Sequence, residues 1–117
     1  ADVVILAVPL TDATRRLADD AFLSRMRDGA VLVNVARGAV ADTEALLKHS
    51  DRLALVLDVT DPEPLPEGHP LWEKAALITP HAGGASAAFA PRIKALVRRQ
   101  AERLIAGDRP ENVVLRP

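Results

Sequence analysis

The sequence contains no cysteine. This absence excludes a disulfide framework and a thiolate metal site, and we expect no metal at all. It also fits a reducing compartment, so we expect a cytoplasmic protein. No sign of charge is in excess either, because 15 basic and 16 acidic residues give a formal net charge of -1. This balance gives no indication of a nucleic-acid partner.

Long apolar runs are absent as well. None approaches the roughly 20 residues that a transmembrane helix needs, so we expect no membrane partner. The N-terminus has no basic segment of the kind that precedes a signal peptide. Instead, Ala1-Asp2 leads directly into the apolar run Val3 to Val8. A chain that begins on a strand in this way is expected to be cut from something longer.

The apolar segments that are present predict alternating strands and helices. Short runs rich in β-branched and aliphatic residues predict strands over 3–8, 30–35, 53–57 and 75–79. The run over 3–8 is continuously apolar, which is typical of a strand covered on both faces. Three helices are predicted, from Asp19 or Asp20 to about Met26, from Asp42 or Thr43 to Leu47 or His49, and from Ser86 to about Ala106. A stretch with four prolines, 62–70, is expected to be an irregular, structured loop.

This alternation, without any hairpin signal, favours an α/β fold. We expect a parallel sheet of about four strands with flanking helices and right-handed crossovers. At 117 residues the chain suggests one domain.

Polar side chains follow the predicted strands at their carboxyl ends. In a parallel sheet these ends lie on one edge, where open α/β sheets bind ligands. The residues concerned are Thr14, Arg37, Asp58, Glu63 and His81. Each has an ordinary alternative: Arg37 as a surface charge, Asp58 as a turn cap, Glu63 as a solvated loop residue and Thr14 as a turn residue. His49 and His69 lack such company and are interpreted as surface or packing residues.

Together these residues suggest a reaction. A carboxylate beside an imidazole stabilises the imidazolium, which makes a proton donor usable near neutral pH. An arginine can hold a substrate carboxylate through two hydrogen bonds. A 2-oxo acid has both a carboxylate to hold and a carbonyl to protonate. Its reduction also requires a hydride, which a nicotinamide cofactor would have to supply.

Four motifs, in this order, resemble the D-isomer-specific 2-hydroxyacid dehydrogenases. They are Ala7-Val8-Pro9-Leu10-Thr11, the run from Gly29 to Gly38, Asp58-Val59 with Glu63-Pro64-Leu65-Pro66, and Thr79-Pro80-His81-Ala82-Gly83-Gly84. The resemblance covers almost the whole chain. It implies an NAD(P)-dependent oxidoreductase that interconverts 2-oxo and 2-hydroxy acids, with NAD as the expected cofactor and NADP as the other choice.

The resemblance also implies roles for individual residues. Arg37 would bind the substrate carboxylate, His81 would be the general acid or base, and Glu63 would pair with His81. Asp58 would hold the nicotinamide carboxamide. The rest of the cofactor would lie against Val8, Pro9, Thr14, Val35, Ala36, Arg37, His81, Ala82, Gly83 and Gly84. The family's cofactor domain usually forms dimers, so a homodimer is expected.

The chain departs from the family in several places. Thr60 stands where an aromatic residue is usual, and Thr43 where an acidic residue is common; both weaken only the choice of subgroup. The glycine-rich G-x-G-x-x-G turn and the family's substrate domain do not occur in these residues. We therefore expect residues 1–117 to be the second half of a Rossmann-type domain. The alternatives are a dinucleotide-sensing or interaction module, like the family's transcriptional co-repressors, and an inactive remnant.

Overall fold

The computed structural model describes residues 1–113 and divides the chain into two compact units. The first, here called the sheet unit, comprises residues 1–83, and the second, the helical unit, starts at Gly84.

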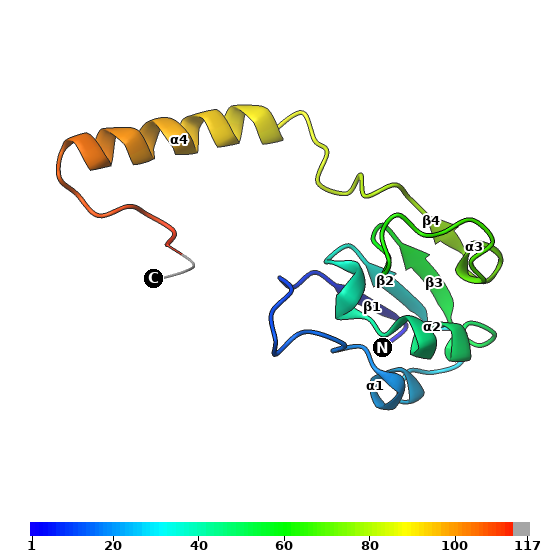
Figure 1. Ribbon diagram of the computed structural model, residues 1–117. Helices are drawn as coiled ribbons and strands as arrows, with labels where there is room; N and C mark the ends of the chain where they lie inside the picture. Colours follow the sequence, from blue (N-terminus) through cyan, green and yellow to red (C-terminus); the bar gives the residue numbers. More distant parts are fainter. Residues whose placement is uncertain (114–117) are drawn as a thin grey trace. The chain divides into compact units, whose positions relative to one another are not determined.

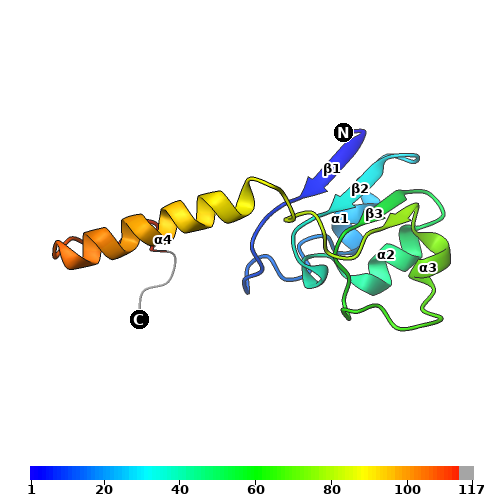
Figure 2. The same ribbon diagram turned by 90° about the horizontal axis from the view of Figure 1, so that it is seen from above.

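The sheet unit is built on four parallel strands (Figures 1 and 2). They are β1 (Val3–Leu6), β2 (Val31–Asn34), β3 (Ala54–Leu57) and β4 (Leu77–Ile78), and they lie side by side in the order β1-β2-β3-β4. The register places Leu6 beside Asn34, Asn34 beside Leu57 and Leu57 beside Ile78. The four strands therefore end together, and the expected parallel sheet is confirmed.

The sheet buries one face only. Leu6, Leu32, Leu55 and Leu57 are buried and pack with apolar residues of the helices. The alternate positions face the other way, and Val3 and Ile5 are 51% and 61% exposed. The prediction that the first strand is covered on both faces is therefore wrong for this unit. Its β-branched run has the composition of a strand covered twice, but the helices of the unit pack on a single face.

Three short helices and one 3-10 turn cover the buried face. They are α1 (Asp20–Ser24), η1 (Gly38–Val40), α2 (Thr43–His49) and α3 (Leu71–Lys74). The aspartates that precede α1 and α2 cap them as predicted. Asp19 accepts a hydrogen bond from the amide of Phe22, and Asp42 accepts from the amides of Glu44 and Ala45. Helix α3 was not predicted, because four residues between a proline-rich loop and a strand give no periodic signal.

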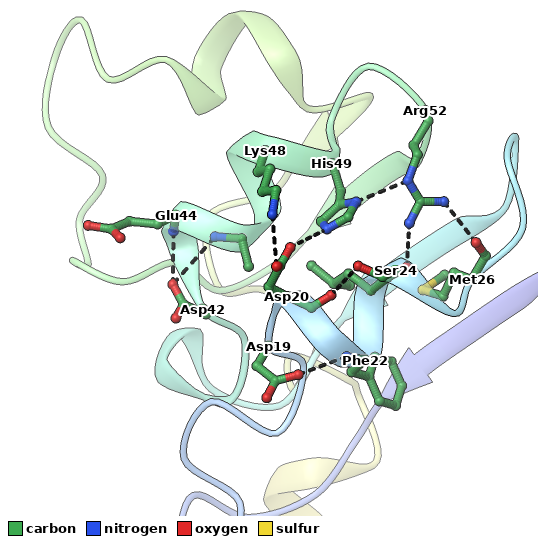
Figure 3. A network of polar contacts seen from close by, with 12 residues as sticks. Asp19, Asp20, Phe22, Ser24, Met26, Asp42, Glu44, Lys48, His49 and Arg52 are labelled. Carbon is green, nitrogen blue, oxygen red and sulfur yellow. Dashed lines mark hydrogen bonds and ion pairs between the residues drawn. The ribbon is translucent and has the colours of Figure 1, made fainter.

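A polar network ties α1 to α2 (Figure 3). Asp20 of α1 accepts from Lys48 at 2.8 Å and contacts Nε2 of His49 at 2.7 Å, and Arg52 Nε donates to Nδ1 of His49 at 3.0 Å. Because a guanidinium only donates, Nδ1 must accept, and the ring hydrogen lies on Nε2 toward Asp20. The hydrogen bonds from Lys48 and His49 lower the pKa of Asp20. His49 is a buried packing residue, one of the two roles expected for it.

The helical unit contains one long helix, α4 (Phe89–Ile105), with Pro91 in its first turn. Gly107 follows its end with a φ of 77°, the left-handed conformation that a glycine commonly adopts after a helix. The segment after the helix bonds back to it, because the side-chain amide of Gln100 pairs with both backbone groups of Glu111. Within residues 1–113 no helix is long and apolar enough to cross a membrane.

Candidate active site

His81 and Glu63 form a direct pair at the carboxyl edge of the sheet. Nδ1 of His81 lies 2.6 Å from Oε1 of Glu63, and the two side chains are 43% and 39% exposed. Glu63 is on the loop after β3 and His81 is on the loop after β4. The backbone of His81 is left-handed, with a φ of 53°, a conformation that few residues other than glycine, asparagine, aspartate and histidine adopt. Glu63 thus engages Nδ1 of the imidazole, and Nε2 is the nitrogen that can contact a ligand.

Asp58 fixes the segment that carries His81. Its Oδ1 accepts from the hydroxyl of Thr79 at 2.5 Å and from the amide of Ala82 at 2.8 Å, while its Oδ2 accepts from the amide of Gly83 at 2.8 Å. The carbonyl of Asp58 also accepts from the amide of His81. The hydrogen bond from Thr79 is the main reason why the pKa of the buried Asp58 lies below its ordinary value of 3.8. Residues on either side of His81 are therefore bound to one carboxylate.

This lowered pKa predicts a loss of stability in acid. The carboxyl of Asp58 binds its proton less readily in the folded chain than in the unfolded one. Its contribution to the free energy of unfolding is therefore fully present above about pH 5. It is lost as the pH falls through the folded pKa, below 3.8. We expect urea midpoints of the wild type to fall more steeply between pH 5 and pH 2 than those of Asp58→Asn. The exposed Asp12→Asn is the control, and equal slopes for all three proteins would contradict the assignment.

Asn34 shapes the turn that presents Arg37. It is 1% exposed, its Nδ2 donates to the carbonyl of Arg37 at 3.2 Å, and its Oδ1 accepts from the amide of Ala36 at 3.1 Å. The Arg37 side chain extends from this turn, where it donates to the carbonyl of Ala36. Sequence reasoning missed Asn34. The only available signal was a polar residue inside an apolar strand.

Loss of the Asn34 amide leaves two backbone groups without their partners. We therefore expect Asn34→Ala to lower the free energy of unfolding by about 1–3 kcal/mol, which urea denaturation measures. Ser24→Ala, which removes a single hydroxyl at an exposed position of α1, is the control and should cost less. Equal stability of Asn34→Ala and the wild type would show that Asn34 does not hold the turn.

Gly38 brings the Arg37 turn against the loop after β3. A Cβ built on Gly38 would lie 1.8 Å from the carbonyl oxygen of Thr60. Only a residue without a side chain permits this approach of two backbones. Arg37 and the loop that carries Glu63 are therefore held side by side.

Two cavities open along this edge of the sheet. The first, about 370 Å³, is lined by Asp58, Thr60, Glu63, Pro64, Leu65, Trp72, Ile78, Thr79, Pro80 and His81. The second, about 520 Å³, is lined by Ala7, Val8, Pro9, Leu10, Val35, Ala36 and Arg37. The expected site residues thus lie at the ends of all four strands. Thr14 lines neither cavity, and its hydroxyl donates to the carbonyl of Pro9. Ala82 and Gly83 line neither cavity, and Gly84 belongs to the helical unit.

The second cavity is lined by apolar side chains together with Arg37. Val8, Pro9 and Val35 give it apolar walls at the ends of β1 and β2. A carboxylate has about four acceptor positions, of which Asp58 uses three for Thr79, Ala82 and Gly83. Among the described residues, one acceptor position of Asp58 is left for a ligand at the first cavity, which Asp58 lines. In residues 1–113 no group of acidic or histidine side chains is suited to a metal ion.

The chain belongs to a family of dehydrogenases. Residues 1–83 match the family model described as "D-isomer specific 2-hydroxyacid dehydrogenase, NAD binding domain". The chain is 37% identical over 117 residues to a glyoxylate reductase of Thermofilum pendens, covering 97% of this chain and 34% of that protein. It is 36% identical to a D-3-phosphoglycerate dehydrogenase of Methanocaldococcus jannaschii, covering 100% of this chain and 23% of that protein. The chain thus spans about a third or less of the length of these relatives.

Solved structures agree with this membership. A D-isomer specific 2-hydroxyacid dehydrogenase from Xanthobacter autotrophicus, in complex with NADPH and MES, is similar with a TM-score of 0.85 and 35% identity over 96% of this chain and 47% of that one. The D-mandelate dehydrogenase of Rhodotorula graminis gives a TM-score of 0.84 and 29% identity over 95% of this chain and 33% of that one. The Rossmann-type fold and the NAD(P) cofactor expected from the sequence are confirmed.

Proposed function

We propose that this chain is the catalytic half of a cofactor domain in a dehydrogenase that reduces a 2-oxo acid to a D-2-hydroxy acid. The observation that carries the proposal is the His81–Glu63 pair, 2.6 Å apart at the edge of the sheet where the Arg37 turn also lies. The family membership and its NAD-binding domain support the same reading. Bound nicotinamide would supply the hydride, and the residues of this chain supply the rest.

In this proposal His81 moves the proton. Its Nδ1 is occupied by Glu63, so Nε2 faces the carbonyl oxygen of the substrate and gives it a proton as the alcohol forms. Glu63 stabilises the imidazolium before the transfer and sets the orientation of the ring. Arg37, exposed on its turn, holds the substrate carboxylate through two hydrogen bonds. In the reverse direction His81 is the base.

The direct test is turnover by the protein that carries this chain. NADH and NADPH oxidation is followed with short 2-oxo acids, with Arg37→Gln as the comparison. We expect turnover in the wild type and a raised KM in the variant, because the carboxylate loses its partner. Binding of NADH without turnover of any 2-oxo acid would overturn the proposal and favour a dinucleotide-sensing module.

Residues 1–117 by themselves lack the glycine-rich turn that holds the pyrophosphate of the cofactor. We therefore expect these 117 residues alone to bind NADH weakly or not at all, and titration of NADH fluorescence measures this. Micromolar affinity would contradict the proposal that they form only half of the cofactor domain.

The last proposal concerns the oligomeric state. We propose a homodimer for the protein that carries this chain, since the family resemblance implies one, and light scattering of the purified protein tests it.

A further inference from the structure

The backbone of Arg16 has an unusual conformation for an arginine. In residues 1–113 three residues other than glycine have a positive φ: Arg16 at 53°, His81 at 53° and Asn112 at 56°. Histidine and asparagine are among the residue types that adopt this left-handed conformation most readily, whereas arginine is not. Such strain persists only where surrounding contacts impose it, and it is most frequent at functional sites. The strain at Arg16 is therefore offset by the contacts of the segment around it.

The segment 16–18 pairs with the 3-10 turn η1, which follows Arg37. The amide of Arg16 donates to the carbonyl of Ala39 at 2.9 Å, and the amide of Ala18 donates to the carbonyl of Val40 at 3.1 Å. The amide of Val40 in turn donates to the carbonyl of Arg37 at 3.0 Å. Because Ala18 and Val40 are fully buried, water does not compete for the bond between them. Backbone hydrogen bonds thus connect the segment 16–18, through η1, to Arg37.

The guanidinium of Arg16 adds little to this pairing. Its Nη1 lies 3.6 Å from Oδ2 of Asp42, and the Arg16 side chain is 71% exposed. An ion pair at the surface contributes little to stability because water screens it. The amide of Arg16, presented by the left-handed backbone, is therefore the group that holds η1.

The loop before this segment is closed on itself and begins at the second cavity. The hydroxyl of Thr14 donates to the carbonyl of Pro9 at 2.7 Å and accepts from the amide of Thr11 at 2.8 Å. Pro9 lines the second cavity, as does Arg37. Residues 9–18 therefore connect one wall of that cavity to the turn that follows Arg37.

We infer that Arg16 is a positioning residue for Arg37. Its left-handed backbone directs its amide to the carbonyl of Ala39, and this contact keeps η1, and with it Arg37, where the guanidinium of Arg37 can hold the substrate carboxylate. The inference rests on the proposed function, which gives Arg37 that role. Arg16 lines neither cavity, so it acts through the backbone of η1 rather than by contact with a ligand.

The experiment separates the backbone of position 16 from its side chain, in the protein that carries this chain. Arg16→Val should raise KM for pyruvate about tenfold, because a β-branched residue disfavours the left-handed conformation and fewer molecules then have the Arg37 turn in place. Its kcat at saturating pyruvate should stay within about threefold of the wild type. Arg16→Gly should keep KM within about twofold, because glycine adopts this conformation freely. Arg15→Val is the matched control, since Arg15 is an exposed neighbour whose φ is not positive.

A second readout does not depend on turnover. Hydrogen–deuterium exchange, followed by mass spectrometry, measures the protection of the amides of Arg16 and Ala18. Both amides are hydrogen-bonded to η1, so they should exchange slowly in the wild type, in Arg16→Gly and in Arg15→Val. They should exchange about tenfold faster in Arg16→Val, where the segment separates from η1 more often.

A KM raised in Arg16→Val alone, with faster exchange at positions 16–18, would support the inference. Equal rises in KM for Arg16→Val and Arg16→Gly would overturn it, because the side chain and not the backbone would then matter. If Arg16→Val does not fold, slow exchange in the wild type with an unchanged KM in Arg16→Gly would support the inference, and fast exchange in the wild type would overturn it.

The proposed function can fail separately. Turnover of pyruvate with the same KM in every variant would overturn the inference and leave the proposed function intact. Absence of turnover by the wild type with every 2-oxo acid would overturn the proposed function, and with it the inference.

Discussion

We expect His81→Asn to lower kcat for 2-oxo acid reduction about 1000-fold while NADH binding is retained, since a positioned general acid contributes about 10²–10⁴. Asparagine is the informative replacement because it tolerates the left-handed backbone that His81 adopts, with a φ of 53°. An alanine at this position would combine the loss of the imidazole with backbone strain. Stopped-flow measurement of NADH oxidation and a fluorescence titration of NADH separate the two effects.

Two further variants sharpen this result. Glu63→Gln keeps a side chain of the same size but removes the charge that faces Nδ1 of His81. We expect kcat to fall in this variant, but by less than in His81→Asn, because the imidazole itself is kept. His69→Ala is the control histidine, because His69 bonds to the start of α3 instead of facing Glu63. A His81→Asn enzyme with more than a tenth of the wild-type kcat would contradict the general-acid assignment.

The second large effect is expected for Gly38→Ala. Its Cβ would meet the carbonyl oxygen, the carbonyl carbon of Thr60 and the amide nitrogen of Asp61 at 1.8, 2.1 and 2.7 Å. All three are backbone atoms, so no flexible side chain can move aside. We expect a loss of about 3 kcal/mol or more in the free energy of unfolding. Because the Arg37 turn must then move away from Thr60, KM for the 2-oxo acid should rise as well.

Urea denaturation and steady-state kinetics measure these two effects. Gly84→Ala is the control for stability, since a Cβ there meets nothing within 4 Å and its backbone is not left-handed. A Gly38→Ala protein as stable as the wild type would show that the two loops do not need their close approach.

Much of the fold could be predicted because local chemistry determines it. Asp19 and Asp42 cap helices where the sequence places them, and Gly107 follows the last helix. The alternation of strands and helices implied parallel strands with a common carboxyl edge. That edge brought His81 and Glu63 together although 18 positions separate them in the chain.

The remaining features depend on tertiary contacts. Val3 and Ile5 have the same composition whether helices cover one face of the sheet or both, so the burial of the first strand was overestimated. Trp72 shows no pattern that would place it beside His81, because the intervening loop of prolines has no periodicity. Asn34 and Gly38 act through the backbones of neighbouring turns, which a sequence pattern does not display. The charged and titratable residues of the site were thus easier to predict than the residues that position them.

The most direct test of the account is isotope transfer. The protein that carries this chain is given pyruvate and NADH deuterated at the reactive face of C4, and the product is analysed by mass spectrometry and chiral chromatography. We expect deuterium on C2 of D-lactate, and little product from His81→Asn. Lactate without deuterium, or lactate of the L configuration, would contradict it.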